Sequence, residues 1–121
     1  MGEYTPIYTP GQSVNGTLST AVVGGNLVAV SATGTIGVAG AASYAVVGVA
    51  STDGAIGAVI AYYTGGVQEL VASGTVTAGQ TVEAAAAGQV STHTDGTGDG
   101  KIVGVALTTA TTGNKARVQM R

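Results

Sequence analysis

The chain of 121 residues contains no Phe, Trp or Cys, so a folded core has to be built from small side chains. Hydrophobic residues still make up 45% of the sequence, and most of them are Ala and Val. Val and Thr are β-branched and favour strands, and the 21 Gly residues disfavour helices and permit tight turns. This combination predicts an all-β protein of short strands, and the length predicts a single domain.

An internal repeat divides most of the chain into two related halves, about 21–64 and 75–121. The matched positions at one constant spacing are Gly25 with Gly79, Val28 with Val82, Gly34 with Gly88, and Ile36 with Val90. A second set follows at a spacing two residues larger, Val46–Ala50 with Ile102–Ala106 and Gly57 with Gly113. Two copies indicate a duplicated fold and not a solenoid, which needs roughly three or more.

Each half is predicted to form a set of strands, and a further strand from Val67 to Ser73 joins the halves. The expected strands are about 26–31, 35–38, 45–50, 57–63, 80–86, 89–92, 102–107 and 115–120. A helix competes at Ala84–Ala87, but the strand-like match in the first half favours a strand. The apolar runs Val46–Ala50 and Ile102–Leu107 are expected to be buried on both faces. The predicted fold is a small β-barrel or sandwich, one β domain over residues 13–121.

Residues 1–12 form a predicted N-terminal arm, which carries the triplets Tyr4-Thr5-Pro6 and Tyr8-Thr9-Pro10 on either side of Ile7. Proline fixes its own φ and disfavours helical geometry at the preceding residue, so the arm is expected to be extended. Two of the five Tyr residues lie here, whereas a solvated tail is usually richer in Ser, Gly and charge. From its residues alone, the arm is either a segment that docks on a partner or a frayed terminus.

Charged residues make up only 8% of the chain, and the formal net charge is −2. Four basic residues cannot neutralise many phosphates, so no nucleic-acid partner is expected. No leader pattern begins the sequence and no apolar run approaches the length of a membrane span. The chain is therefore expected to stay soluble in a cytoplasm without a membrane partner, and its low charge favours association between copies.

The loop Gly96–Lys101 resembles a phosphate-binding loop only superficially. Asp95 and Ile102 stand where such a loop requires Gly and a Ser or Thr. Asp95, Asp99 and Asp53 offer oxygen atoms for calcium, but each precedes a Gly, and an Asp-Gly turn explains it without a metal. We therefore predict no cofactor and no metal site.

His93 is the only histidine, and the neighbouring Ser91 and Asp95 suggest a hydrolase triad. No nucleophile elbow or oxyanion context accompanies these residues. A His in a loop rich in Thr and Gly is usually solvated, and that is the state expected for His93. The carboxylates outside this loop are scattered, so we predict no catalytic residue and no enzymatic activity.

The order of segments along the whole chain resembles a known family. The segments that carry the resemblance are "EYTPIYTPG", "AVVGGNLVAVSATGTI", "AVVGVASTDGAIG", "GGVQELVASGTVTAGQTV" and "IVGVALTTATTGNKARV". Together they are similar to the capsid cement or head decoration proteins of tailed phages, especially those of phages of actinobacteria. No single motif is unique to the family, so the resemblance rests on the order of the segments.

The resemblance implies a compact β-tulip-like barrel, similar to the lambda-type head decoration protein, with an extended N-terminal segment. It implies trimers at three-fold and quasi-three-fold positions on the outside of the expanded capsid. The partners would be the major capsid protein and other copies of the chain, and the place of synthesis the bacterial host cytoplasm. The capsid-contact arm would consist of Tyr4, Thr5, Pro6, Ile7, Tyr8, Thr9 and Pro10.

Two questions stay open. The first is the role of the chain, for which the alternative is another phage structural subunit, of a tail tube or a head-fibre base. The second is the role of the basic residues Lys115, Arg117 and Arg121, which gather in the last predicted strand. They form either a charged outer face that protects an edge strand from unwanted pairing or a contact with an acidic capsid surface.

Overall fold

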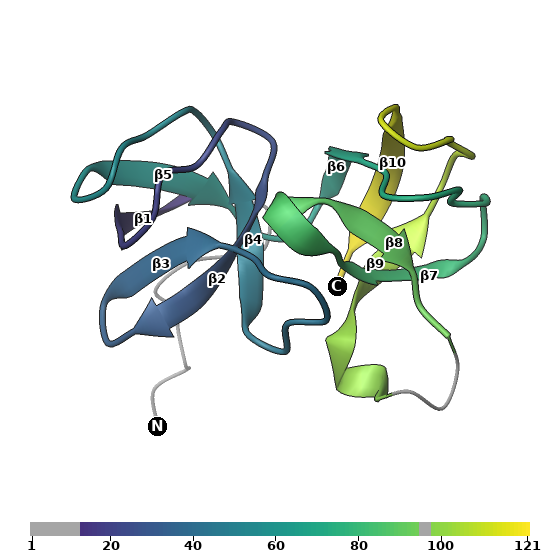
Figure 1. Ribbon diagram of the computed structural model, residues 1–121, viewed down its shortest axis with the longest axis horizontal. Coiled ribbons are helices and arrows are strands. Elements are labelled where there is room, and N and C mark those ends of the chain that lie inside the picture. Colours follow the sequence, from purple (N-terminus) through teal and green to yellow (C-terminus); the bar gives the residue numbers. More distant parts are fainter. Residues whose placement is uncertain (1–12, 95–97) are drawn as a thin grey trace, which may run out of the picture.

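The computed structural model describes residues 13–94 and 98–121 of the chain, and it is all-β (Figure 1). The described strands are β1 (Ser13–Leu18), β2 (Leu27–Ala32), β3 (Thr35–Val38), β4 (Val46–Ala50), β5 (Val59–Tyr63), β6 (Val67–Val71), β7 (Thr81–Ala84), β8 (Val90–Thr92), β9 (Ile102–Ala106) and β10 (Lys115–Met120). Two short 3₁₀ turns, η1 (Ala86–Gly88) and η2 (Asp99–Lys101), complete the described elements. No helix in these residues is long and apolar enough to cross a membrane.

The first half of the chain forms a closed barrel in the order β1-β3-β2-β4-β5. β1 closes it by pairing on both sides, antiparallel with β5 and parallel with β3. The parallel contact is short and joins Thr17 to Thr35 and Leu18 to Ile36. Alternate residues of each strand point inward, so Leu18, Ile36 and Ile60 fill the barrel with aliphatic side chains.

The second half repeats this topology in a five-stranded sheet of order β6-β10-β9-β7-β8. An isolated parallel bridge between Ala72 and Val90 occupies the place of the Leu18–Ile36 pair of the first barrel. Figure 1 shows the two units side by side, with β1–β5 on the left and β6–β10 on the right. The predicted fold class, a small β-barrel with an internal repeat, is confirmed.

One hydrophobic cluster joins the two halves. It contains Leu27, Ala29 and Val49 of the first half and, from the second, residues such as Leu70 and Val82. Val28 and Ala50 belong to the other cluster, inside the first barrel. β2 and β4 are therefore buried on both faces, as expected for the run Val46–Ala50. The matching expectation fails at Leu107, which follows β9 and is 47% exposed.

Two parts of the predicted strand set are wrong. β1 was not expected, because its sequence SVNGTL has few large apolar residues and its pairing partners lie far along the chain. The strand predicted over 80–86 ends at Ala84, and η1 follows it, with Ala87 at φ 59°. The turn is held by the first half, because the Gly88 N–H donates to the Ala39 carbonyl and the Ala42 N–H donates to the Ala84 carbonyl.

Candidate functional site

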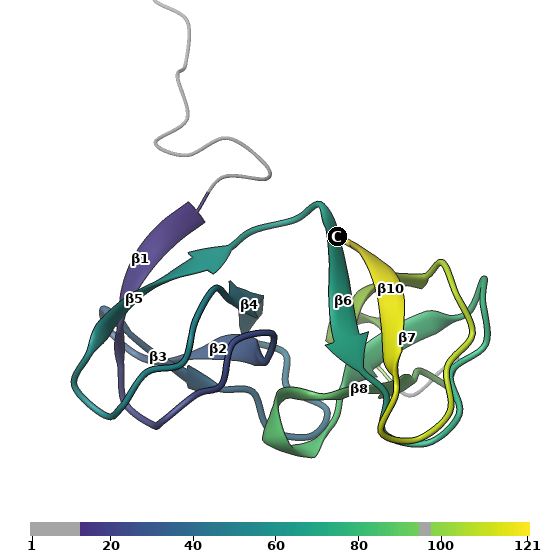
Figure 2. The same ribbon diagram turned by 90° about the horizontal axis from the view of Figure 1, so that it is seen from above.

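The predicted capsid-contact arm, Tyr4 to Pro10, lies outside the described residues. The described chain begins at Ser13, the first residue of β1, whose start lies at the margin of the molecule in Figure 2. β1 is fixed there by antiparallel pairing with β5 from Ser13 to Thr17. The arm thus joins the barrel at a strand that is anchored along its whole length.

His93 is buried, and the expectation of a solvated side chain is wrong. Its residue is 5% exposed, and its backbone N–H donates to the Thr81 carbonyl as an extension of the β7–β8 ladder. This register brings the imidazole to the face of β7 that carries Glu83. Nδ1 lies 2.9 Å from Glu83 Oε1, and Nε2 lies 3.3 Å from Asp99 Oδ1 in η2.

The suggested triad does not form around His93. Both ring nitrogens face carboxylates, so neither is directed at the Ser91 hydroxyl. Asp95, the third member, lies outside the described residues. The imidazole lies between two carboxylates and so connects η2 to the sheet. These contacts satisfy both ring nitrogens, so the burial of His93 is explained without a catalytic role.

The carboxylates considered for calcium are engaged separately. Asp53 accepts a hydrogen bond of 2.8 Å from the Gly24 N–H, and Asp99 faces His93. Within residues 13–94 and 98–121, no group of three or more His, Cys, Asp or Glu side chains is placed to hold a metal ion. Asp53 therefore acts as a bridge between two turns of the first half.

The buried cluster leads to a stability prediction. Replacing His93 by Ala leaves Glu83, whose side chain is 15% exposed, without its imidazole partner. The expected loss is about 2 kcal/mol of unfolding free energy, measured by urea denaturation. Glu69→Ala is the control, because the Glu69 side chain is 57% exposed and pairs loosely with Arg117, so its removal should change stability by less than about 0.5 kcal/mol. Equal stability of the two variants would contradict a stabilising role for His93.

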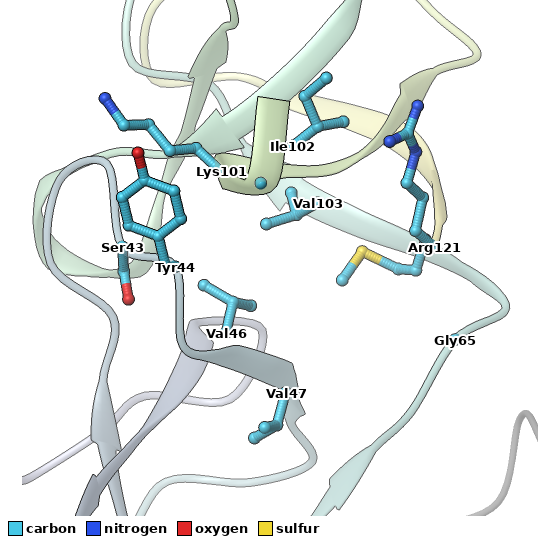
Figure 3. A pocket seen from close by; sticks show the side chains of 11 residues that line it. Ser43, Tyr44, Val46, Val47, Gly65, Lys101, Ile102, Val103 and Arg121 are labelled. Atoms are coloured by element: carbon cyan, nitrogen blue, oxygen red, sulfur yellow. The ribbon is translucent and has the colours of Figure 1, made fainter. Parts of the chain in front are cut away.

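A small hollow lies between the two halves (Figure 3). Its volume of about 80 Å³ holds only a few water molecules. Tyr44 and Lys101 lie together at its rim, with the ammonium 5.7 Å from the ring centre, and Arg121 lies across from them. Val46 and Val47 of β4 form part of its wall. The hollow is too small for a substrate of ordinary size.

The basic residues of β10 do not protect an edge. β10 lies between β6 and β9, so that interpretation is wrong. Arg117 and Glu69 stand directly opposite each other in neighbouring strands, with Nε 3.8 Å from Oε1. Both side chains are more than half exposed, so this pair lies on a solvated face of the second half.

Sequence reasoning missed a set of exposed apolar residues. The large apolar side chains at the surface are Val23, Val30, Tyr44, Ile56, Val59, Tyr63, Val67 and Leu107. Most of them belong to the first half. A position-by-position comparison of the two halves contains the signal that would have found them, because the matching residues of the second half are mainly polar.

The chain is similar to known proteins in both its sequence and its fold. The family model for phage cement protein matches residues 8–121. Among solved structures, the head fiber gp8.5 N base in bacteriophage phi29 matches with a TM-score of 0.71 and 16% sequence identity, covering 91% of this chain and 93% of that chain. This likeness shows a shared fold. A search of curated proteins found no match. Because the family model spans nearly the whole chain, including every described strand, the chain belongs to the phage cement protein family and is a structural protein of a phage virion.

Proposed function

We propose that this protein decorates and stabilises the outside of the expanded phage capsid, with no catalytic role. It would bind the major capsid protein as trimers at three-fold and quasi-three-fold positions. Residues 13–121 would act as one domain, and Tyr4 to Pro10 would reach across the shell. The observation that carries the proposal is the family match over residues 8–121.

The shared hydrophobic cluster supports the one-domain part of this proposal. Leu27 and Val49 of the first half pack in the same cluster as Leu70 of the second, so neither half buries its apolar face alone. Backbone hydrogen bonds from Ala42 and Gly88 also cross between the halves. The two halves would therefore bind the shell as one unit.

Mass action explains how such a protein would stabilise a shell. A ligand that binds the expanded shell and not the unexpanded one stabilises the expanded shell by RT ln(1 + L/Kd) at each site, where L is the free ligand concentration, so tighter binding or more free ligand favours expansion. A trimer presents three arms at once, so contacts that are modest in one arm combine into strong binding. Ordering each arm residue costs about 1–2 kcal/mol, which strand addition and burial of Tyr and Ile would offset.

Co-sedimentation with phage heads tests the proposal. The purified protein is mixed with expanded, undecorated heads of its phage, with unexpanded proheads as the control. We expect saturable binding to expanded heads alone, at a stoichiometry that fits the three-fold positions. Binding to both shells would contradict a maturation-dependent clamp, and binding to neither would contradict decoration.

A head-fibre base is the second candidate, because the solved base of a phage head fibre shares this fold. A fibre base needs a further protein partner and occupies only the sites that carry fibres. The stoichiometry from the same co-sedimentation separates the two roles, since cement covers the shell. A tail-tube subunit would instead form rings or tubes and ignore heads.

A further inference from the structure

The outer faces of the two halves differ in chemistry although they share one geometry. In the first half, β1 and β5 pair Ser13 with Tyr63, Asn15 with Ala61, and Thr17 with Val59. In the second half, β6 and β10 pair Val67 with Gln119, Glu69 with Arg117, and Val71 with Lys115. Side chains alternate along a strand, and Leu18, Ile60, Leu70 and Val118 of the same strands point into the cores, so these pairs lie on the outer faces.

We call the outer face of β1 and β5 the neutral face, made of Ser13, Asn15, Thr17, Val59, Ala61 and Tyr63. It carries no charged side chain. Val59 is 65% exposed and Tyr63 is 44% exposed. The corresponding face of the second half carries the charged residues Glu69, Lys115 and Arg117 beside Gln119, Val71 and Val67, of which Val67 is 51% exposed.

The apolar character continues beside the neutral face. Ile56, in the turn that leads into β5, is 73% exposed, and Thr112 takes its place in the second half. The equivalence rests on matching hydrogen bonds, because the Gly57 N–H donates to the Leu18 carbonyl as the Gly113 N–H donates to the Ala72 carbonyl. The fold thus accepts a polar residue at this position, and the apolar one in the first half is not required for folding.

Covering exposed Val, Ile and Tyr side chains with a partner contributes about 25 cal/mol of binding free energy for each Å² of apolar surface removed from water. Contiguous apolar surface on a protein mostly marks an interaction site. The duplicated fold supplies an internal comparison, since β10 carries Lys115, Arg117 and Gln119 where β5 carries Val59, Ala61 and Tyr63. The difference points to a partner that covers the first half and leaves the second half exposed.

We infer that the neutral face packs against a second copy of this chain. An uncharged sheet face gives a charged partner nothing to pair with, and the centres of protein interfaces are depleted of charge and enriched in Tyr. Only 8% of the residues of this chain are charged, so a second copy offers a largely uncharged surface. The inference deepens the proposed function and rests on it only for the number of copies.

The test replaces residues of the first half with those that the second half carries. Val59→Lys with Tyr63→Gln introduces the side chains of Lys115 and Gln119, which the same backbone already accommodates. The control removes charge from the opposite half, with Lys115→Ala and Arg117→Ala. Molar mass is measured for the full chain by light scattering after gel filtration, at micromolar concentration.

We expect the wild-type chain and the control to have a mass that is a multiple of 11.6 kDa, and the double variant to fall to 11.6 kDa. Circular dichroism checks that the variant is folded. If it is not, Ala61→Arg, which copies Arg117, provides the second variant and should also give monomers. A monomeric wild-type chain, or a folded variant that keeps the wild-type mass, would overturn the inference.

Head binding separates this inference from the proposed function. A wild-type oligomer that the variant dissociates, with no head binding by either, would support the neutral face and refute the cement role. A monomeric wild-type chain whose head binding is lost in the variant would make the neutral face a shell contact. That result would overturn self-association while keeping the cement role.

Discussion

Replacing Gly104 by Val is expected to lower the unfolding free energy by about 3 kcal/mol or more. Gly104 lies in β9 where the strand passes close to β10, and a Cβ there would overlap the Gln119 backbone carbonyl. The neighbour is backbone in a paired strand, so it cannot rotate away as a flexible side chain would. A loss of this size is a large part of the roughly 5–15 kcal/mol that stabilises an ordinary domain.

Gly40→Ala is the matched control, because a Cβ at that position meets nothing within 4 Å. Urea denaturation of the two variants beside the wild-type chain measures the difference. Gly48→Val should behave like Gly104→Val, since a Cβ at Gly48 would overlap the Tyr63 carbonyl. If Gly104→Val proves as stable as Gly40→Ala, the two strands can separate without cost and the close approach is not required.

These two glycines explain why so much of the fold could be predicted. The internal repeat places Gly48 and Gly104 at matching positions. At each of them the strand passes too close to its neighbour for a side chain. Turn glycines also match, with Gly25 at φ 92° and Gly79 at φ 90°. A local requirement such as a left-handed turn depends on a single residue, usually Gly, so the position of the turn can be predicted from the sequence.

Features that depend on distant partners could not be predicted in this way. β1 forms a strand because its backbone pairs with β5 and β3, and its own polar sequence does not indicate a strand. The burial of His93 depends on Glu83 and on Asp99, which meet it only after β7, β8 and η2 are in place. In both cases the deciding contact is tertiary, and strand propensity does not encode it.

The same distinction between local and long-range features applies to the candidate site. The extended arm was predicted from its Pro and Tyr residues and its contact with the capsid from the family resemblance, and both stay predictions. The neutral face was missed because a Val on a strand is ordinary when it is viewed alone. It became visible only when Val59 was set beside Lys115 and Tyr63 beside Gln119, at equivalent positions of one duplicated fold.

Deleting residues 1–10 is expected to abolish decoration of expanded heads while the remaining domain stays folded. All the described strands begin at or after Ser13, and the barrel closes through β1, β3 and β5, so the deletion removes none of the pairings among the described strands. Three arms acting together multiply a modest contact, so their loss should weaken apparent head binding by roughly a hundredfold or more. Co-sedimentation with expanded heads measures this, and circular dichroism reports on the fold.

Two further variants distinguish the arm from the barrel as the source of binding. Tyr4→Ala with Tyr8→Ala keeps the length and the prolines of the arm but removes the aromatic rings that would bury against the shell. It should bind heads more weakly than the wild-type chain and more strongly than the deletion. The deletion should keep the wild-type number of copies per oligomer, because the neutral face starts at Ser13. If the deleted protein still decorates heads fully, the barrel alone holds the shell and the arm has another role.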